Sequence, residues 1–270
     1  MPELPEVETI VRELTPKLTG KSFKGIDIYW ERTVDGKHSE FIKILKGNTI
    51  TSVDRRGKYI CFYLESGDKM TLHLRMTGKL LFELCEKDKP YLRVAFTFNH
   101  RLHLYFVDTR KFGRIKIWKK GTPFLPNIGP EPLKQQSVFH VLHNLKSKRA
   151  IKTTLLDQSV LAGIGNIYAD EAFFLAGIHP ATPASLLTPT EREKLSQTIP
   201  HILLNAIENK GTTISDYRKT DHSMGNNQFY LNVYGREKEG CRRCGTRIQR
   251  ITLNNRSSYF CETCQPLTVD

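Results

Sequence analysis

The chain opens with Met1-Pro-Glu-Leu-Pro-Glu-Val-Glu8, and this stretch predicts a helix that begins almost at the first residue. The apolar residues that fall at helical spacing are Val7, Ile10, Val11, Leu14 and Leu18. They would bury one face of that helix. Proline suits the first helical turn, where its missing N–H is not needed, and glutamates favour the positive end of the helix dipole. The simplest interpretation is a well-capped first helix.

A second interpretation concerns the amine that removal of Met1 would leave on Pro2. The small side chain of proline favours this removal, and Glu3 lies beside the new terminus. A secondary amine can form an iminium with an aldehyde-like carbon, which is nucleophilic catalysis. Both interpretations stay open at this point, because the opening residues do not show what such an amine would attack.

The composition points to a polyanionic partner. The chain has 41 Lys and Arg against 28 Asp and Glu, which gives a formal net charge of +13 and a pI near 9.5. This excess favours nucleic acid first and an anionic membrane second, and no basic amphipathic helix supports the membrane. No apolar run approaches the ~20 residues that span a bilayer, and no signal-peptide pattern is present. We therefore expect a cytoplasmic protein that binds nucleic acid.

Residues 22–118 are predicted to form an antiparallel β-sandwich. Their segments are short, rich in β-branched and aromatic residues, and separated by turn signals such as Arg56-Gly-Lys58. The predicted strands are Ser22–Trp30, Thr49–Asp54, Tyr59–Leu64, Lys69–Leu74, Lys79–Leu84, Leu92–Phe98, Leu102–Val107 and Arg114–Trp118. Together with the first helix they make up a predicted domain of residues 1–120.

The pattern turns helical beyond a linker rich in Pro and Gly at 121–136. The predicted helices are Val138–Leu145, Ile151–Asp157, Asn166–Ala176 and Pro189–Asn209. Pro200 should kink or split the last of them. Residues 210–235 are polar and rich in Gly, Ser, Asn and Asp, which favours a long mobile loop. The predicted domains are thus a helical one at 137–235 and a cysteine module at 236–270, in a multi-domain α+β chain.

Four of the six cysteines form one constellation. Cys241-Arg-Arg-Cys244 and Cys261-Glu-Thr-Cys264 are sixteen residues apart, a spacing that brings four thiolates into the tetrahedron of a structural zinc site. The alternative is a pair of disulfides, which a cytoplasmic chain disfavours. Cys61 lies in a predicted buried strand, and Cys85 follows a strand without an evident partner.

A basic hairpin is predicted between the two cysteine pairs, from Ile248–Leu253 and Ser257–Phe260. Residues 236–256 contain seven Arg or Lys and only two Glu. On a rigid zinc base, Arg256 near the hairpin tip would suit contact with a phosphate. Without that setting, Arg256 would be interpreted as a solvated turn residue.

The other dense stretch is Leu155-Leu-Asp-Gln-Ser-Val-Leu-Ala-Gly-Ile-Gly-Asn-Ile-Tyr-Ala-Asp-Glu171. Gly163 and Gly165 fit a tight turn between two helices, with Asn166 near the start of the second. Free N–H groups at a helix start bind phosphate, although a packing joint between helices explains the turn equally well. Lys152 and the basic run at 146–149 favour contact with the DNA backbone.

These motifs resemble the formamidopyrimidine-DNA glycosylase family of bacterial base-excision repair enzymes. The resemblance rests on residues 1–8, on Leu156-Asp-Gln with residues 163–172, and on the four-cysteine module, and it runs from end to end. It implies a β-sandwich, a helix–two-turn–helix unit and a zinc finger with one structural Zn²⁺. The implied partner is double-stranded DNA that contains an oxidised base or an abasic site. No feature indicates an oligomer, so we expect a monomer.

The resemblance also implies a bifunctional DNA glycosylase and abasic-site lyase. The amine of Pro2 would attack C1′ of the damaged nucleotide, and Glu3 would act as general acid and base. Lys58 would meet the phosphate of the lesion and assist catalysis. β,δ-Elimination would then cut the strand, and the reaction needs the damaged base flipped out of the stack.

Further residues match the family's contacts with DNA. The residues that resemble its phosphate contacts are His73, Asn166 and Arg256. Met76, Arg110 and Phe112 match the trio that fills the gap left by the flipped base. By themselves, Met76 and Phe112 would more often be core residues, whereas Arg110 would hydrogen-bond the orphaned base, usually cytosine. This trio favours oxidised purines such as 8-oxoguanine and formamidopyrimidines.

Two alternatives stay open. An endonuclease VIII-like enzyme has the same fold but prefers oxidised pyrimidines. The stretch Gly225-Asn-Asn-Gln-Phe-Tyr-Leu231 departs from the family's usual loop over the flipped base, because asparagines come first and Gln228 is shifted. The lesion preference depends on that loop. A non-catalytic DNA-binding protein with a zinc ribbon is the alternative from another class.

Overall fold

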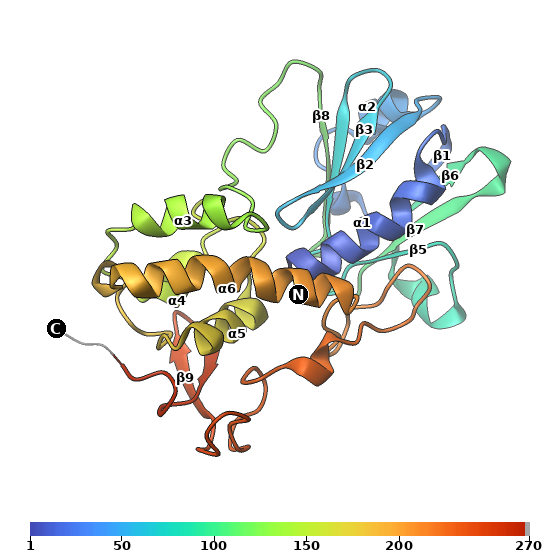
Figure 1. The fold of residues 1–270 in the computed structure, drawn as a ribbon. Coiled ribbons are helices and arrows are strands. Elements are labelled where there is room, and N and C mark those ends of the chain that lie inside the picture. The colour runs from blue at the N-terminus through green and yellow to red at the C-terminus, as the bar shows by residue number, and fades with distance from the viewer. Residues whose placement is uncertain (268–270) are drawn as a thin grey trace. The chain divides into compact units, whose positions relative to one another are not determined.

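The computed structural model describes residues 1–267, which form two compact units (Figure 1). The first unit comprises Met1–Pro126 and Asn209–Gln228. The second comprises Asn127–Glu208 and the chain from Phe229 onward. The segment 209–228 therefore packs with the first unit, although its neighbours on both sides in the sequence belong to the second. The domain boundaries near 120, 136 and 235 stay predictions.

Two four-stranded antiparallel sheets build the first unit and confirm the predicted sandwich. Their strand orders are β1-β6-β7-β5 and β2-β3-β4-β8. The strands are β1 (Phe23–Ile28), β2 (Ile50–Arg56), β3 (Tyr59–Leu64), β4 (Lys69–His73), β5 (Lys79–Leu81), β6 (Leu92–Phe98), β7 (His103–Val107) and β8 (Arg114–Trp118). Alternation of side chains gives each sheet one apolar face, and these faces meet in the core.

Helix α1 (Leu4–Leu18) packs its apolar stripe onto this core, as predicted. Leu14 and Leu18 are fully buried, and burial of one such side chain stabilises the fold by about 1.5–3 kcal/mol. Tyr217, from the segment 209–228, belongs to the same core. The remaining helices of this unit are α2 (His38–Leu45), η1 (Glu31–Thr33), η2 (Glu86–Tyr91) and η3 (Asn99–Arg101).

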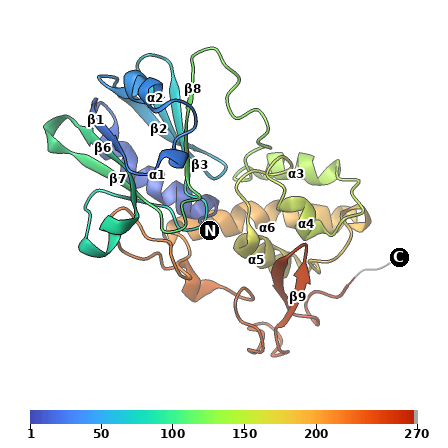
Figure 2. The same ribbon diagram turned by 180° about the vertical axis from the view of Figure 1, so that it is seen from behind.

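The second unit contains the helices and the cysteine module (Figures 1 and 2). Its helices are α3 (Gln135–His143), α4 (Ile151–Leu155), α5 (Asn166–Ala176), η4 (Ala184–Leu186) and α6 (Pro189–Glu208), and its hairpin consists of β9 (Gln249–Leu253) and β10 (Arg256–Phe260). The division of the chain between the units falls within the short helix η5 (Asn227–Tyr230), after Gln228. Strand β10 packs against α5.

Helix α6 runs without a break through Pro200, so the expected split is wrong. An interior proline removes one helical hydrogen bond and crowds the carbonyl four residues earlier, at a cost of about 3 kcal/mol, which the packing of this helix must offset. The buried face of α6, which includes Leu195, Ile199 and Leu203, continues on both sides of Pro200. Among the described residues, no helix combines the length and apolarity needed to cross a bilayer.

Candidate functional site

The start of α1 is held by one buried glutamate. Pro2 and Glu3 are buried, while Met1 is 45% exposed. The backbone N–H of Glu3 donates to Glu6 Oε2 at 2.7 Å, and the N–H of Thr212 donates to Glu6 Oε1 at 2.7 Å. Glu6 itself is 1% exposed. It therefore fixes the backbone next to Pro2 and ties the segment 209–228 to the same place.

The segment 209–228 follows a defined path, although its composition favoured a mobile loop. Gln228 Oε1 accepts from the N–H of Thr213 at 3.0 Å, and Gln228 Nε2 donates to the carbonyl of Gly225 at 2.7 Å. Asn227 Nδ2 donates to Thr212 Oγ1 at 2.8 Å. A Cβ on Gly225 would lie 2.1 Å from the carbonyl oxygen of Gly211, so only glycine fits there. Asn227 and Gln228 thus bond the C-terminal end of the segment 209–228 to its N-terminal end.

Lys58 lies at the tip of the β2–β3 hairpin. Gly57 precedes it with a φ of +56°, and only 5% of Lys58 is exposed. Arg55 Nε donates to Glu8 Oε2 at 2.9 Å, and Arg55 Nη1 donates to the carbonyl of Gly57 at 3.1 Å. Arg55 therefore attaches the hairpin that carries Lys58 to the helix that Glu3 caps.

His73 ends strand β4, directly opposite Tyr59 of β3. The backbone N–H of Arg75 donates to His73 Nδ1 at 2.9 Å. Burial, followed by the positive charges of Arg75 and Lys58, lowers the pKa of His73 to about 3. The ring is therefore neutral at neutral pH, with its proton on Nε2, where it can donate to an anionic oxygen.

The structure brings Met76, Arg110 and Phe112 together at the surface. Met76 is 37% exposed and Phe112 is 46% exposed, so neither is a core residue. Arg110 Nη1 lies 3.0 Å from Met76 Sδ, and the guanidinium carbon lies 4.8 Å from the centre of the Phe112 ring. Apolar side chains that project around a cation suit insertion between stacked bases.

Buried Asp108 shapes both loops that carry this trio. Its carboxylate accepts from the N–H of Gly113 at 2.8 Å and from the N–H of Arg110 at 3.2 Å, and it also accepts from the hydroxyl of Thr77. A Cβ on Gly113 would lie 2.3 Å from the Phe106 ring, so the second loop can approach the core only with glycine there. The hydrogen bonds of Asp108 thus hold the two loops from which the exposed trio projects.

In the second unit, two helices hold the strand that begins at Arg256. Asn166 Nδ2, at the start of α5, donates to the carbonyl of Ser257 at 2.9 Å. Lys152 Nζ donates to the same carbonyl at 2.8 Å and lies 2.7 Å from Asp170 Oδ1. Arg256 is exposed at the end of a turn through Asn254 and Asn255, whose φ angles are positive. The side chain of Arg256 is therefore presented to solvent from a fixed backbone.

The glycine turn before α5 is shaped by Gln158. Its amide nitrogen donates to the carbonyls of Leu156 and Ile164 at 3.0 and 2.9 Å, and its amide oxygen accepts from the N–H of Gly163 at 3.0 Å. Gly163 has a φ of +81°. Gln158 thus fixes the turn that positions the N-terminus of α5.

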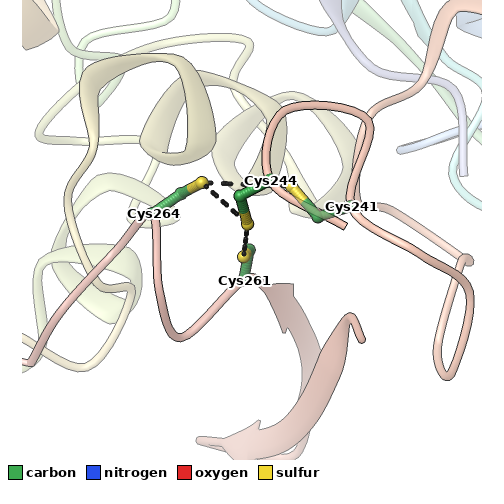
Figure 3. Close-up of side chains that lie close together, drawn as sticks. All are labelled: Cys241, Cys244, Cys261 and Cys264. Atoms are coloured by element: carbon green, nitrogen blue, oxygen red, sulfur yellow. Dashed lines mark hydrogen bonds between the residues drawn. The ribbon is translucent and has the colours of Figure 1, made fainter. Parts of the chain in front are cut away.

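The four predicted zinc ligands converge in the second unit (Figure 3). Cys241 Sγ lies 4.0 Å from Cys264 Sγ, and Cys244 Sγ lies 3.4 Å from Cys261 Sγ and 3.5 Å from Cys264 Sγ. Zn–S bonds of ~2.3 Å in a tetrahedron place sulfurs about 3.8 Å apart. The cluster fits one structural zinc, which confirms that prediction, and no disulfide forms among the described residues.

Three family models cover most of the chain. The N-terminal domain of formamidopyrimidine-DNA glycosylase matches residues 1–115, the H2TH domain of the same protein matches residues 128–218, and a zinc finger found in FPG and IleRS matches residues 238–267. Formamidopyrimidine-DNA glycosylase of Ligilactobacillus salivarius is 43% identical over 272 residues, which cover 98% of this chain and 99% of the relative. The chain belongs to the formamidopyrimidine-DNA glycosylase family.

Solved structures of this family have the same fold. The MutM (FPG) protein of Thermus thermophilus superposes with a TM-score of 0.89 at 38% identity, over 99% of this chain and 100% of that protein. A Lactococcus lactis FPG mutant, in complex with DNA that contains Fapy-dG, gives a TM-score of 0.88 at 35% identity, over 98% of this chain and 100% of that protein. The likeness therefore extends over both units and the finger.

The predicted contact of Lys152 with the DNA backbone is wrong. Lys152 and its partner Asp170 are both 0% exposed, so the ammonium group cannot reach a DNA phosphate. Burial raises the pKa of Asp170 to about 7, and the charge of Lys152 opposes that rise. Lys152 acts instead as a buried link between α4, α5 and β10. Its place after the basic run at 146–149 gave no sign of this burial.

Three further buried carboxylates of this formamidopyrimidine-DNA glycosylase fold were not predicted from the sequence to organise the site. Glu6 was interpreted only as a helix-dipole residue, and Asp108 was not singled out. Glu171 is 2% exposed, and its carboxylate accepts from the backbone N–H groups of Asn232, Val233 and Tyr234 at 2.8–2.9 Å. A carboxylate inside an otherwise apolar stretch was the available signal, since such a group needs donors when it is buried.

Proposed function

We propose that the chain is a DNA glycosylase of base excision repair that removes oxidised purines from duplex DNA and cuts the strand at the resulting abasic site. Its relatives are formamidopyrimidine-DNA glycosylases, and solved complexes of the Lactococcus lactis protein contain DNA with Fapy-dG or an abasic site. The observation that carries the proposal is the buried helix start, where Glu6 fixes the backbone of Glu3 beside Pro2.

In the proposed reaction, the Pro2 amine that is exposed by removal of Met1 attacks C1′ of the damaged nucleotide. The C1′–N bond breaks, the base leaves with a proton, and the amine and C1′ form an iminium. An N-terminal amine with a pKa of roughly 8 leaves enough neutral amine for this attack near neutral pH. Glu3 protonates the opening sugar and later removes a proton from C2′. Successive loss of the 3′ and 5′ phosphates then leaves a one-nucleotide gap.

Other residues of the first unit would bind the substrate in this reaction. Lys58 and the Nε2–H of neutral His73 suit phosphate oxygens next to the lesion. Met76 and Phe112 would enter the stack where the damaged base has left it, and Arg110 would hydrogen-bond the orphaned base.

The second unit would contribute binding to the DNA backbone. The N-terminus of α5 at Asn166 offers backbone N–H groups, and exposed Arg256 offers a guanidinium. Because its relatives are bacterial proteins, we place the chain in the bacterial cytoplasm, where it would work as a monomer on nucleoid DNA.

Borohydride reduction tests the proposed nucleophile. Protein whose mature mass shows loss of Met1 should be trapped covalently on duplex DNA with an abasic site, because reduction fixes the iminium. Acetylation of the terminal amine should abolish trapping, whereas Glu65→Gln, at an exposed position in the same unit, should leave it unchanged. Trapping that survives acetylation, or no trapping by the processed protein, would contradict the role of Pro2.

Lesion preference is tested separately with two duplexes. One duplex carries 8-oxoguanine opposite cytosine, and the other carries thymine glycol. The exposed trio around Arg110 favours the first substrate, because the guanidinium suits the acceptors of an orphaned cytosine. Faster cleavage of the thymine glycol duplex would instead favour the endonuclease VIII-like alternative.

A further inference from the structure

A second group of metal-binding side chains lies in the first unit, away from the zinc finger in the sequence. Cys85 immediately precedes η2, Asp88 lies within η2, and His222 comes from the segment 209–228. One ligand atom from each of the three lies within 4.8 Å of the others. The expectation that Cys85 lacks a partner is therefore wrong: its Sγ lies 2.7 Å from Asp88 Oδ2 and 3.8 Å from both ring nitrogens of His222.

We propose that Cys85, Asp88 and His222 bind one divalent transition-metal ion, best suited to Zn²⁺, with water as the fourth ligand. Thiolate, imidazole and carboxylate are the three ligand types that zinc accepts, and three protein ligands leave one position open. The thiolate and the carboxylate together balance the double charge of the ion. This site would be additional to the four-cysteine zinc.

The distances are close to those of a tetrahedral site. Zn–S bonds of ~2.3 Å and Zn–N or Zn–O bonds of ~2.0 Å place the ligand atoms about 3.3–3.5 Å apart. His222 Nδ1 lies 3.6 Å from Asp88 Oδ2 and 3.8 Å from Cys85 Sγ. Only the separation of Cys85 from Asp88 must widen, from the 2.7 Å of a thiol–carboxylate hydrogen bond. Loss of the thiol proton on metal binding removes the reason for that short contact.

Neighbouring groups already orient two of the three ligands. His222 Nε2 lies 3.0 Å from the carbonyl oxygen of Glu83, so an Nε2–H donates there and leaves the Nδ1 lone pair for a metal. A ligating histidine commonly has its other nitrogen bonded to a backbone carbonyl or carboxylate in this way. Lys79 Nζ lies 3.6 Å from Asp88 Oδ1, which leaves Oδ2 on the side of Cys85 and His222. Asp88 is only 3% exposed, as expected of a positioned ligand.

A catalytic thiol is the competing interpretation of the same cluster, and the contacts disfavour it. In a nucleophilic triad the carboxylate orients the imidazole, and the imidazole activates the thiol. Here the carboxylate of Asp88 bonds the thiol directly at 2.7 Å, whereas the nearest imidazole nitrogen lies 3.6 Å from that carboxylate, beyond hydrogen-bond distance. A divalent cation, in contrast, would displace the thiol proton and satisfy all three groups.

Metal binding would give the segment 209–228 a further anchor on the sandwich. The turn before His222 is already attached, because the N–H and hydroxyl of Thr220 donate to Glu13 Oε2 at 2.9 and 2.8 Å. The N–H of Phe82 also donates to the carbonyl of Thr220 at 3.3 Å. A metal on His222 would link this turn to η2 as well. The ion would thus add to the contacts that already hold the segment.

Metal stoichiometry of the full-length chain tests the proposal. After dialysis against Zn²⁺ and removal of loosely held ion, wild-type protein should contain two Zn²⁺, whereas Cys85→Ser and His222→Gln should each contain one. Cys61→Ser is the matched control, because Cys61 is a buried thiol in β3 that belongs to neither metal group, and it should keep two. The zinc retained in the finger shows that each variant has folded its second unit.

Two further measurements separate a specific site from general binding. The second equivalent of Co²⁺ should add thiolate-to-metal charge-transfer absorption that Cys85→Ser lacks. Zn²⁺ should also slow tryptic cleavage after Arg218 and Lys219 several-fold in wild-type protein, with no effect in His222→Gln. A wild-type chain that retains one Zn²⁺, or a Cys85→Ser chain that retains as many ions as wild type, would overturn the proposal.

Discussion

Replacement of Glu6 by Gln should loosen the contact between the helix start and the segment 209–228. The carboxylate accepts two backbone N–H groups at 2.7 Å, from Glu3 and Thr212, and it is almost fully buried. A glutamine of the same size has one acceptor oxygen, and its NH₂ group faces the second donor. A hydrogen bond to a charged group contributes about 1.5–3 kcal/mol, so local opening around Thr212 should become easier by that amount.

Amide hydrogen exchange measures this effect directly. A free-energy change of about 1.5–3 kcal/mol corresponds to exchange roughly 10- to 150-fold faster, because about 1.4 kcal/mol is a factor of ten. The acceleration should appear in peptides that span residues 210–214 and at the start of α1, and borohydride trapping should slow because Pro2 is less well held. Glu65→Gln should change neither. If residues 210–214 of Glu6→Gln exchange their amide hydrogens at the wild-type rate, the assigned role of Glu6 is refuted.

Three other perturbations follow from the contacts. The pKa of His73 is about 3 in the folded chain against an ordinary 6.5, so the unfolded chain takes up this proton first and stability falls as pH drops from about 6.5 towards 3. The Tm of His73→Asn should therefore decline less steeply over this pH range than the Tm of wild-type protein. Equal declines of Tm with pH in the two proteins would contradict this. The logarithm of the DNA-binding constant falls as the logarithm of the salt concentration rises, and Arg256→Ala should make this negative slope shallower by about 0.9. An unchanged slope would exclude a phosphate contact of Arg256. Lys152→Met should destabilise the second unit by about 3–5 kcal/mol in urea unfolding, because Asp170 is left buried without its cation, and a loss below about 1 kcal/mol would contradict the pair.

Elements with a regular local pattern could be predicted closely. Strands Tyr59–Leu64, Leu92–Phe98 and Arg114–Trp118 and helix Asn166–Ala176 have the bounds that the sequence indicated. Alternating burial defines such strands, and the glycine turn marks the start of α5. The short helix α2 was missed because only Phe41 and Leu45 of its eight residues are buried, too few for a helical period to stand out.

Contacts between residues far apart in the sequence could not be predicted in this way. Glu6 bonds Thr212 across 206 positions, and Cys85 meets His222 across 137. The burial of Lys152 depends on Asp170, which reaches it only after α4 and α5 have packed. For the same reason Met76 and Phe112, apolar in sequence, could be placed at the surface only once Asp108 had fixed their loops. The resemblance to a family identified residue types, whereas the folded contacts decide which side chains can reach a ligand.

Because residues 209–228 belong to the first unit, that unit can complete its fold only after residues 127–208 of the second unit have been synthesised. Tyr217 fills part of the sandwich core, and the carboxylates of Glu6 and Glu13 receive their donors from Thr212 and Thr220. A ribosome that has released only residues 1–126 has therefore delivered a sandwich with an unfilled core position and two acceptors that lack these donors. That nascent sandwich must wait, through synthesis of the helices, until residue 228 has emerged. A fragment cut at residue 126 would remain in the same incomplete state permanently, which would expose it to aggregation and proteolysis.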